Sequence, residues 1–306
     1  MKYLTLGKSP LKVSAVAVGC MRLSGLDEKQ AGEFTDTAME LGINFFDHAD
    51  IYGGGKCEEI FGSVLKSRPS LREKIVLQSK CGIIPGKMYD FSKEYILKSV
   101  DGILKRLNTE YLDVLVLHRP DALMEPEEVA GAFDALKVSG KVRYFGVSNH
   151  SPLQIQLLKK YVKQDIVVDQ LQLSLTNASM ISAGMEVNML TPGAVDRDGG
   201  VLDFCRLNDI TIQTWSPFQY GMFEGACIGS SKYPELNETL KEMAKKYDAD
   251  ETAVAAAWIL RHPANMQLIS GSMSAPRLSS ICLGAEISLS REDWYKLYLS
   301  AGHILP

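Results

Sequence analysis

The chain lacks a long apolar run, a block of basic residues and a secretion signal. No apolar run approaches the roughly 18 residues that a membrane-spanning helix requires. The 33 basic and 37 acidic residues are interspersed and give a formal net charge of −4, which argues against nucleic acid and anionic membranes as partners. The first ten residues contain no continuous apolar stretch typical of a signal peptide. We therefore expect a cytoplasmic protein with no membrane and no nucleic-acid partner.

Close cysteine pairs and metal-ligand spacings are also missing. The five histidines show no spacing typical of a zinc site, so no metal is expected. The six cysteines form no Cys-x-x-Cys pair, which predicts free thiols in a reducing compartment. These cysteines are Cys20, Cys57, Cys81, Cys205, Cys227 and Cys282.

Short apolar runs alternate with amphipathic stretches along almost the whole chain. The runs are rich in Val, Ile and Leu and nearly continuous, as in strands buried on both faces of a parallel sheet. Helix-start signals support the intervening stretches, with Ser92 and Ser151 as expected N-caps. We expect strands at 13–18, 44–46, 75–79, 113–117, 142–147, 166–171, 210–214 and 267–269, and helices at 28–41, 92–107, 126–139, 152–162, 252–260 and 291–299.

Eight strand–helix units without a linker predict a (β/α)₈ TIM barrel that forms one domain over residues 1–306. The alternative is a doubly wound sheet. The segment after the first strand, 19–25, lacks the Gly-x-Gly-x-x-Gly pattern of a dinucleotide-binding half, and no Walker loop occurs. We therefore favour the barrel, with long loops at its C-terminal face over 174–200 and 219–231 and with extra helices.

Three consecutive expected strands end near a residue that can exchange a proton or hold a charge. Asp47 closes one apolar run and Tyr52 lies in the loop after it, Lys80 closes the next run and His118 the third. Each residue alone has an ordinary explanation: a helix cap, a packed ring, a solvated ammonium or a core histidine. Their joint position at the C-terminal ends of strands is what a barrel enzyme requires.

These four residue types together suit acid catalysis by a phenol. An unperturbed tyrosine has a pKa of about 10, and we expect a nearby ammonium, held by a carboxylate, to lower the pKa of Tyr52. A histidine can hydrogen-bond a substrate oxygen. Such a group can protonate a carbonyl oxygen while a cofactor delivers hydride to the carbon.

The local motifs resemble those of the aldo-keto reductases. They are Asp-x-Ala-x-x-Tyr-Gly at 47–53, Ser79-Lys80, Leu117-His118-Arg-Pro-Asp121 and the segment 140–149. Within that family the chain looks most like the bacterial YdhF-like oxidoreductases. The resemblance implies a catalytic tetrad in which Tyr52 is the general acid, Asp47 and Lys80 tune it, and His118 orients the carbonyl.

The resemblance also implies a nicotinamide cofactor. Ser148, Asn149 and Gln170 would hydrogen-bond the carboxamide, and Trp215 would stack on the ring. Gly271 stands where many relatives have a lysine, yet Ser272 and Arg277 suit a phosphate, so we favour NADPH and leave NADH open. The remaining expected cofactor contacts are Cys20, Met21, Ser216, Pro217, Phe218 and Ser270.

The expected substrate is a small carbonyl compound. The expected lining, Met21, Tyr52, Tyr89 and residues 174–190, is apolar and favours apolar or aromatic aldehydes and ketones. We expect His48 to be a packing residue and the chain to be a monomer. An alternative function is a cofactor-binding regulatory subunit with little or no turnover, because some relatives act chiefly as partners of other proteins.

Overall fold

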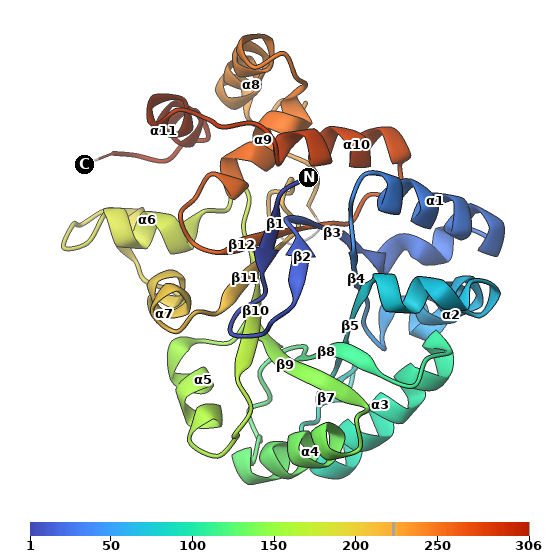
Figure 1. Ribbon diagram of the computed structural model, residues 1–306. Coiled ribbons are helices and arrows are strands. Elements are labelled where there is room, and N and C mark those ends of the chain that lie inside the picture. Colours follow the sequence, from blue (N-terminus) through green and yellow to red (C-terminus); the bar gives the residue numbers. More distant parts are fainter. Residues whose placement is uncertain (222–223, 306) are drawn as a thin grey trace.

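The computed structural model describes residues 1–221 and 224–305, and its centre is a closed barrel of eight parallel strands. Figure 1 shows the strands gathered in the middle of the molecule with the helices arranged around them. The predicted TIM-barrel fold is therefore confirmed. In order around the barrel, the strands are β3 (Val16–Gly19), β4 (Phe45–Asp47), β5 (Val76–Cys81), β8 (Leu112–Leu117), β9 (Val142–Ser148), β10 (Ile166–Gln172), β11 (Thr211–Trp215) and β12 (Met266–Ser270).

The helices cover the outside of the barrel, and several short elements supplement them. The α-helices are α1 (Glu28–Glu40), α2 (Lys56–Ser67), α3 (Lys93–Leu107), α4 (Pro126–Val138), α5 (Pro152–Lys159), α6 (Ser179–Met185), α7 (Val201–Leu207), α8 (Pro234–Lys246), α9 (Glu251–Leu260), α10 (Ala275–Gly284) and α11 (Arg291–Ser300). The 3₁₀ helices are η1 (Cys20–Gly25), η2 (Tyr52–Gly55), η3 (Pro69–Lys74) and η4 (Pro192–Ala194). Two short strands, β6 (Ile83–Ile84) and β7 (Met88–Tyr89), pair antiparallel above β5.

An N-terminal hairpin, β1 (Tyr3–Thr5) and β2 (Lys12–Ser14), covers the end of the barrel at which the strands begin. Leu6 and Val13 are fully buried and belong to one apolar cluster with Phe45, Val76 and Val114, near the starts of three barrel strands. A larger cluster fills the space between barrel and helices. The hairpin therefore excludes water from the lower barrel, and the opposite end remains available for a site.

The strand expected at 13–18 is wrong as one element. The chain bends at Ala15, so that residues 12–14 belong to the hairpin and residues 16–19 to the barrel. Two hydrogen bonds stabilise the bend: Ser14 Oγ donates to Val16 O at 2.7 Å, and Ala15 N donates to Lys2 O at 2.9 Å. A run of buried residues cannot reveal this change of partner.

The expected helices agree well with the structure at their starts. Ser92 caps α3 as expected, since its Oγ accepts from Tyr95 N. The helix expected over 152–162 ends at Lys159, where the chain tightens into a turn. Helices α2, α7, α8 and α10 lie outside the expected helix ranges, and α6 lies inside the expected loop 174–200. Residues 222 and 223 of the expected loop 219–231 lie outside the described residues.

All six cysteines are buried and free, in agreement with the sequence. Among residues 1–221 and 224–305, no helix combines the length and the apolar character needed to cross a membrane.

Replacing Gly62 with alanine should destabilise the protein. Gly62 lies in α2, where a Cβ atom would come within 2.0 Å of Arg106 O near the end of α3. Overpacking of this kind costs about 1–3 kcal/mol. The matched control is Gly184→Ala in α6, where a Cβ would meet nothing within 4 Å and alanine favours the helix. Chemical denaturation should show a loss for the first variant only, and equal stabilities would contradict this account of the α2–α3 contact.

Candidate active site

The structure brings Asp47, Tyr52, Lys80 and His118 together at the C-terminal ends of three neighbouring strands. Asp47 ends β4, Lys80 lies on β5, and His118 follows β8. Tyr52 begins the 3₁₀ helix after β4. Because parallel strands all end at the same rim of the barrel, residues far apart in sequence meet there.

Lys80 is the centre of this group. Its Nζ lies 2.7 and 2.8 Å from the two carboxylate oxygens of Asp47, 2.8 Å from His48 O and 3.1 Å from Tyr52 OH. Both side chains of the Lys80–Asp47 pair are almost fully buried. Burial alone would lower the pKa of Lys80, but Asp47 and Tyr52 raise it above its ordinary value, so the ammonium stays charged.

The hydrogen bond between Lys80 and Tyr52 has a direction. An ammonium group can only donate, so the Tyr52 oxygen must accept. The phenolic proton of Tyr52 is therefore not used in this bond. Tyr52 lines the cavity described below, which lets that proton point toward a ligand.

The pKa of Tyr52 differs from the sequence expectation. Burial raises it above the ordinary value of a phenol, and the ammonium of Lys80 opposes this effect without reversing it. The expected net lowering is therefore wrong, because the depth at which the ring is buried cannot be read from the sequence. The raised pKa keeps Tyr52 protonated at neutral pH, as a proton donor must be.

His118 completes the group as an uncharged ring. Its plane is nearly perpendicular to that of Tyr52, with ring centroids 5.9 Å apart. Burial, with the charges of Lys80 and Arg119, lowers the pKa of His118 well below its ordinary value. A neutral imidazole can hydrogen-bond a substrate oxygen but is a poor source of a proton at neutral pH.

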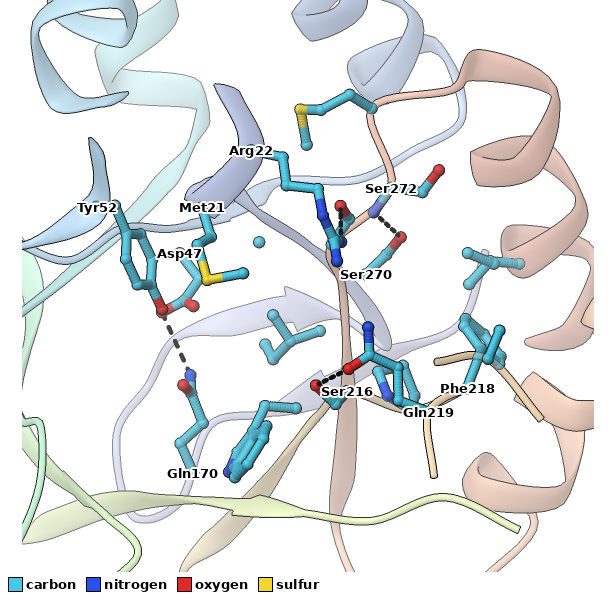
Figure 2. A pocket seen from close by; sticks show the side chains of 18 of the residues that line it. Met21, Arg22, Asp47, Tyr52, Gln170, Ser216, Phe218, Gln219, Ser270 and Ser272 are labelled. Atoms are coloured by element: carbon cyan, nitrogen blue, oxygen red, sulfur yellow. Dashed lines mark hydrogen bonds between the residues drawn. The ribbon is translucent and has the colours of Figure 1, made fainter. Parts of the chain in front are cut away.

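A cavity of about 1130 Å³ opens beside these residues. Figure 2 shows it extending from Tyr52, Asp47 and Gln170 toward Ser270, Ser272 and Phe218. Lys80 itself is not among the lining residues. The residues expected from the sequence that do line it are Met21, Asp47, Tyr52, His118, Ser148, Asn149, Gln170, Trp215, Ser216, Pro217, Phe218, Ser270, Gly271, Ser272 and Arg277.

Two expectations about the lining are not met. Cys20 is fully buried and its thiol points to Val18 O, so it is not placed to contact a ligand. Tyr89 and residues 174–190 do not line the cavity, and Tyr89 is exposed on β7. His48 packs against Phe61 as expected, with ring centroids 4.8 Å apart.

Trp215 is held in place by a relay of polar side chains. Its indole Nε1 donates to Asn149 Oδ1 at 3.1 Å, and Asn149 Nδ2 donates to Ser148 Oγ at 2.7 Å. Ser148 Oγ in turn donates to Gln170 O at 3.0 Å. Asn149 has a φ of 58°, a left-handed conformation that asparagine tolerates. The relay fixes one wall of the cavity before any ligand binds.

Three arginines lie at the cavity, and the sequence reasoning recognised only Arg277. Arg22 reaches across to Gly271 O, to which its Nη1 donates at 2.9 Å. The guanidinium of Arg119 lies 5.9 Å from the Trp215 ring centroid. Within the described residues, none of the three pairs with an acid. Arg119 directly follows His118 in the sequence, and this position next to a tetrad residue could have identified it as a cavity residue.

Comparison with known proteins assigns the family. The family model described as "Aldo/keto reductase family" matches residues 15–298. The chain belongs to the aldo/keto reductase family. It is 33% identical to a 6-dehydroglucose reductase from Novosphingobium aromaticivorans, over 99% of this chain and 97% of that protein, and 30% identical to oxidoreductase YdhF from Escherichia coli, over the full length of both.

A solved structure supports the same assignment. The thermostable aldo-keto reductase Tm1743, crystallised with the inhibitor epalrestat, has a TM-score of 0.78 to this chain and 27% sequence identity, over 98% of this chain and all of that one. The resemblance inferred from the motifs, including the YdhF-like oxidoreductases, is thus confirmed. Aldo/keto reductases are oxidoreductases that generally use NAD(P)H and act on small carbonyl compounds.

Neither Tyr52 nor His118 should contribute a titration step to the activity around neutrality. Burial raises the pKa of Tyr52 above about 10 and lowers that of His118 well below about 6.5, so neither group changes its protonation between about pH 6.5 and about pH 9. The measurement is kcat/KM against pH at saturating cofactor. A midpoint near pH 6.5 that disappears in His118→Gln would show that the histidine titrates and would contradict its assignment as a neutral ring.

Proposed function

We propose that this aldo/keto reductase reduces aldehydes or ketones to alcohols with NADPH. The observation that carries the proposal is the direction of the Lys80–Tyr52 hydrogen bond, which leaves the phenolic proton free beside the cavity. The family match over residues 15–298 supports treating the chain as one such domain, and we propose that it acts as a monomer in the cytoplasm.

Each residue of the tetrad has a distinct part in the proposed reaction. Held by Asn149, Gln170 and Trp215, a reduced nicotinamide would supply hydride to the carbonyl carbon. Tyr52 donates its proton to the carbonyl oxygen as negative charge develops there, and Lys80 stabilises the phenolate that remains. Asp47 holds the ammonium of Lys80 in position. His118 orients the carbonyl by a neutral hydrogen bond.

The cavity fits a nicotinamide dinucleotide. Gln170 and Asn149 offer amides beside Trp215, whose indole provides a fixed flat surface for the nicotinamide ring. Toward the other end, Ser272 offers a hydroxyl and Arg277 a guanidinium that pairs with no acid among residues 1–221 and 224–305. A guanidinium can donate two parallel N–H bonds to phosphate oxygens, which favours the phosphorylated cofactor.

The substrate wall is more polar than expected from the sequence. Ile51 and Ile83 provide apolar surface, but Arg119 places a cation near His118. A relative is named for the reduction of a dehydroglucose. We therefore extend the proposed substrate class from apolar and aromatic carbonyl compounds to polar ones whose oxygens can bind the guanidinium.

Tyr52→Phe should abolish reduction without loss of cofactor binding. The change keeps the ring and removes the proton, and general acid catalysis contributes about 10²- to 10⁴-fold. The measurement is consumption of NADPH with a reactive aromatic aldehyde, alongside cofactor binding by fluorescence. Tyr144→Phe is the matched control, because that hydroxyl lies in β9 away from the tetrad and makes no hydrogen bond among the described residues.

Turnover by Tyr52→Phe at the wild-type rate would refute the proposed mechanism. Wild-type protein that binds NADPH tightly but turns over no compound of a carbonyl panel would instead support the regulatory subunit.

Arg277→Gln should weaken binding of NADPH far more than binding of NADH. Hydrogen bonds to charged groups contribute about 1.5–3 kcal/mol, or about 10- to 100-fold in Kd. Titration of both cofactors against wild type, Arg277→Gln and the exposed control Arg291→Gln measures this selectivity. The two cofactors differ in the 2′-phosphate that only NADPH carries. An equal loss for both would therefore show that Arg277 does not bind this phosphate.

A further inference from the structure

Four glutamines occupy the interior of the barrel beneath the tetrad. Gln78, Gln213 and Gln267 are fully buried, and Gln170 is 4% exposed. Barrel interiors are usually filled by branched apolar side chains. A buried amide without partners costs several kcal/mol, so this many amides in one place require an explanation. Of these four glutamines, only Gln170 lines the cavity.

The strand register brings these side chains side by side. Gln170 pairs with Gln213, and Gln213 pairs with Gln267, at neighbouring positions of β10, β11 and β12. On the other side of the barrel, Asp47 of β4 pairs with Gln78 of β5. Gln78 then reaches across the interior to Gln213.

Hydrogen bonds join the amides into a chain that ends at Asp47. Gln267 Nε2 donates to Ser14 O at 2.8 Å, and Gln213 Nε2 donates to Gln267 Oε1 at 2.8 Å. Gln213 Oε1 accepts from Gln78 Nε2 at 2.8 Å and from Gln170 Nε2 at 3.1 Å. The same two nitrogens donate to Asp47 Oδ1 at 2.6 and 3.3 Å, and the bond from Gln170 is drawn in Figure 2.

The hydrogen bonds of this amide chain can run in only one direction. A backbone carbonyl only accepts, so Gln267 must turn its nitrogen toward Ser14 and its oxygen toward Gln213. Gln213 must then present its nitrogen to Gln267 and its oxygen to the other two glutamines. Those two must present nitrogen, which matches a carboxylate that also only accepts. Reversing any amide would bring two donors or two acceptors together.

The amide chain determines which atom of the Gln170 side chain faces the cavity. Both N–H groups of its amide are used by Asp47 and Gln213. Its Oε1 makes no hydrogen bond with the described residues, so it is the polar atom left for the cavity. Gln170 is thereby presented as an acceptor, the complement of an amide N–H on a ligand.

We propose that Gln213 is a positioning residue that fixes the orientation of Gln170 toward the cofactor carboxamide and holds Asp47 as a charged acceptor. The ligand part of this inference rests on the proposed function, because it takes the donor to be the carboxamide of a nicotinamide. Gln213 itself contacts neither substrate nor cofactor, since it lies below the cavity lining. It acts through the two glutamines that its oxygen aligns.

Gln213→Leu tests the loss of the chain. The variant leaves Gln170 free to rotate and removes one partner of Gln78, so the Kd for NADPH should rise about tenfold, the equivalent of one hydrogen bond. The KM of the carbonyl substrate should not change. Val168→Ala is the control, because it loosens the apolar packing inside the barrel without touching the amide chain. It should lower the melting temperature and leave the Kd unchanged.

Gln213→Glu gives a readout that a purely structural role would not produce. A protonated glutamate can accept from Gln78 and Gln170 and donate its O–H to Gln267, so it replaces the amide. Once ionised it has no proton to donate, and it adds a second negative charge near Asp47 and Lys80. Relative to wild type measured at the same pH, cofactor binding should therefore be unchanged at low pH and weaken about tenfold as pH rises.

The outcomes separate this inference from the proposed function. Wild type that binds neither NADPH nor NADH would overturn both. Wild type that binds NADPH, with a folded Gln213→Leu of unchanged Kd, would overturn the inference alone. If Gln213→Leu does not fold, Gln213→Glu decides the matter, because a flat pH profile relative to wild type in that variant would also overturn the inference.

Discussion

The buried ion pair between Lys80 and Asp47 is the interaction on which the rest of the structure depends. Taking two charges out of water costs several kcal/mol per ion, and their attraction offsets this only when the remaining hydrogen-bonding capacity is also satisfied. Lys80 meets that condition with His48 O and Tyr52 OH, and Asp47 meets it with two glutamine amides. The pair therefore determines the polar character of the upper barrel and the direction of the bond to Tyr52.

A dry, polar site at one end requires a closed, apolar seal at the other. Leu6 and Val13 of the N-terminal hairpin pack with the first inward residues of the strands, and the cavity opens at the opposite end, beside the tetrad. Burial away from water raises the pKa of Tyr52 and lowers that of His118. Burial thus assigns the two rings different tasks: the tyrosine keeps a proton to donate, and the histidine stays neutral.

The sequence predicted the barrel and the tetrad because both leave local patterns. Buried parallel strands appear as apolar runs, and the residue that ends each run marks the catalytic rim. The glutamine chain leaves no such pattern, because Gln170, Gln213 and Gln267 become neighbours only through the register of three strands. The net pKa of Tyr52 was mistaken for the same reason: depth of burial belongs to the assembled barrel. Arg22 was missed because its contact with Gly271 joins the two ends of the chain.

The bend at Ser14 and Ala15, which the expected strand 13–18 did not include, also anchors the amide chain. Ser14 stabilises the bend between the hairpin and β3, and Asn44 Oδ1 accepts from its backbone N–H at 2.8 Å. The carbonyl oxygen of Ser14 accepts from Gln267. From there a continuous path of hydrogen bonds runs through Gln213 and Gln78 to Asp47 of the tetrad. The bend that joins the sealing hairpin to the barrel therefore supplies the fixed acceptor that orients every amide up to Asp47. Ser14 thus serves both the closure of the fold and the polarity of the site.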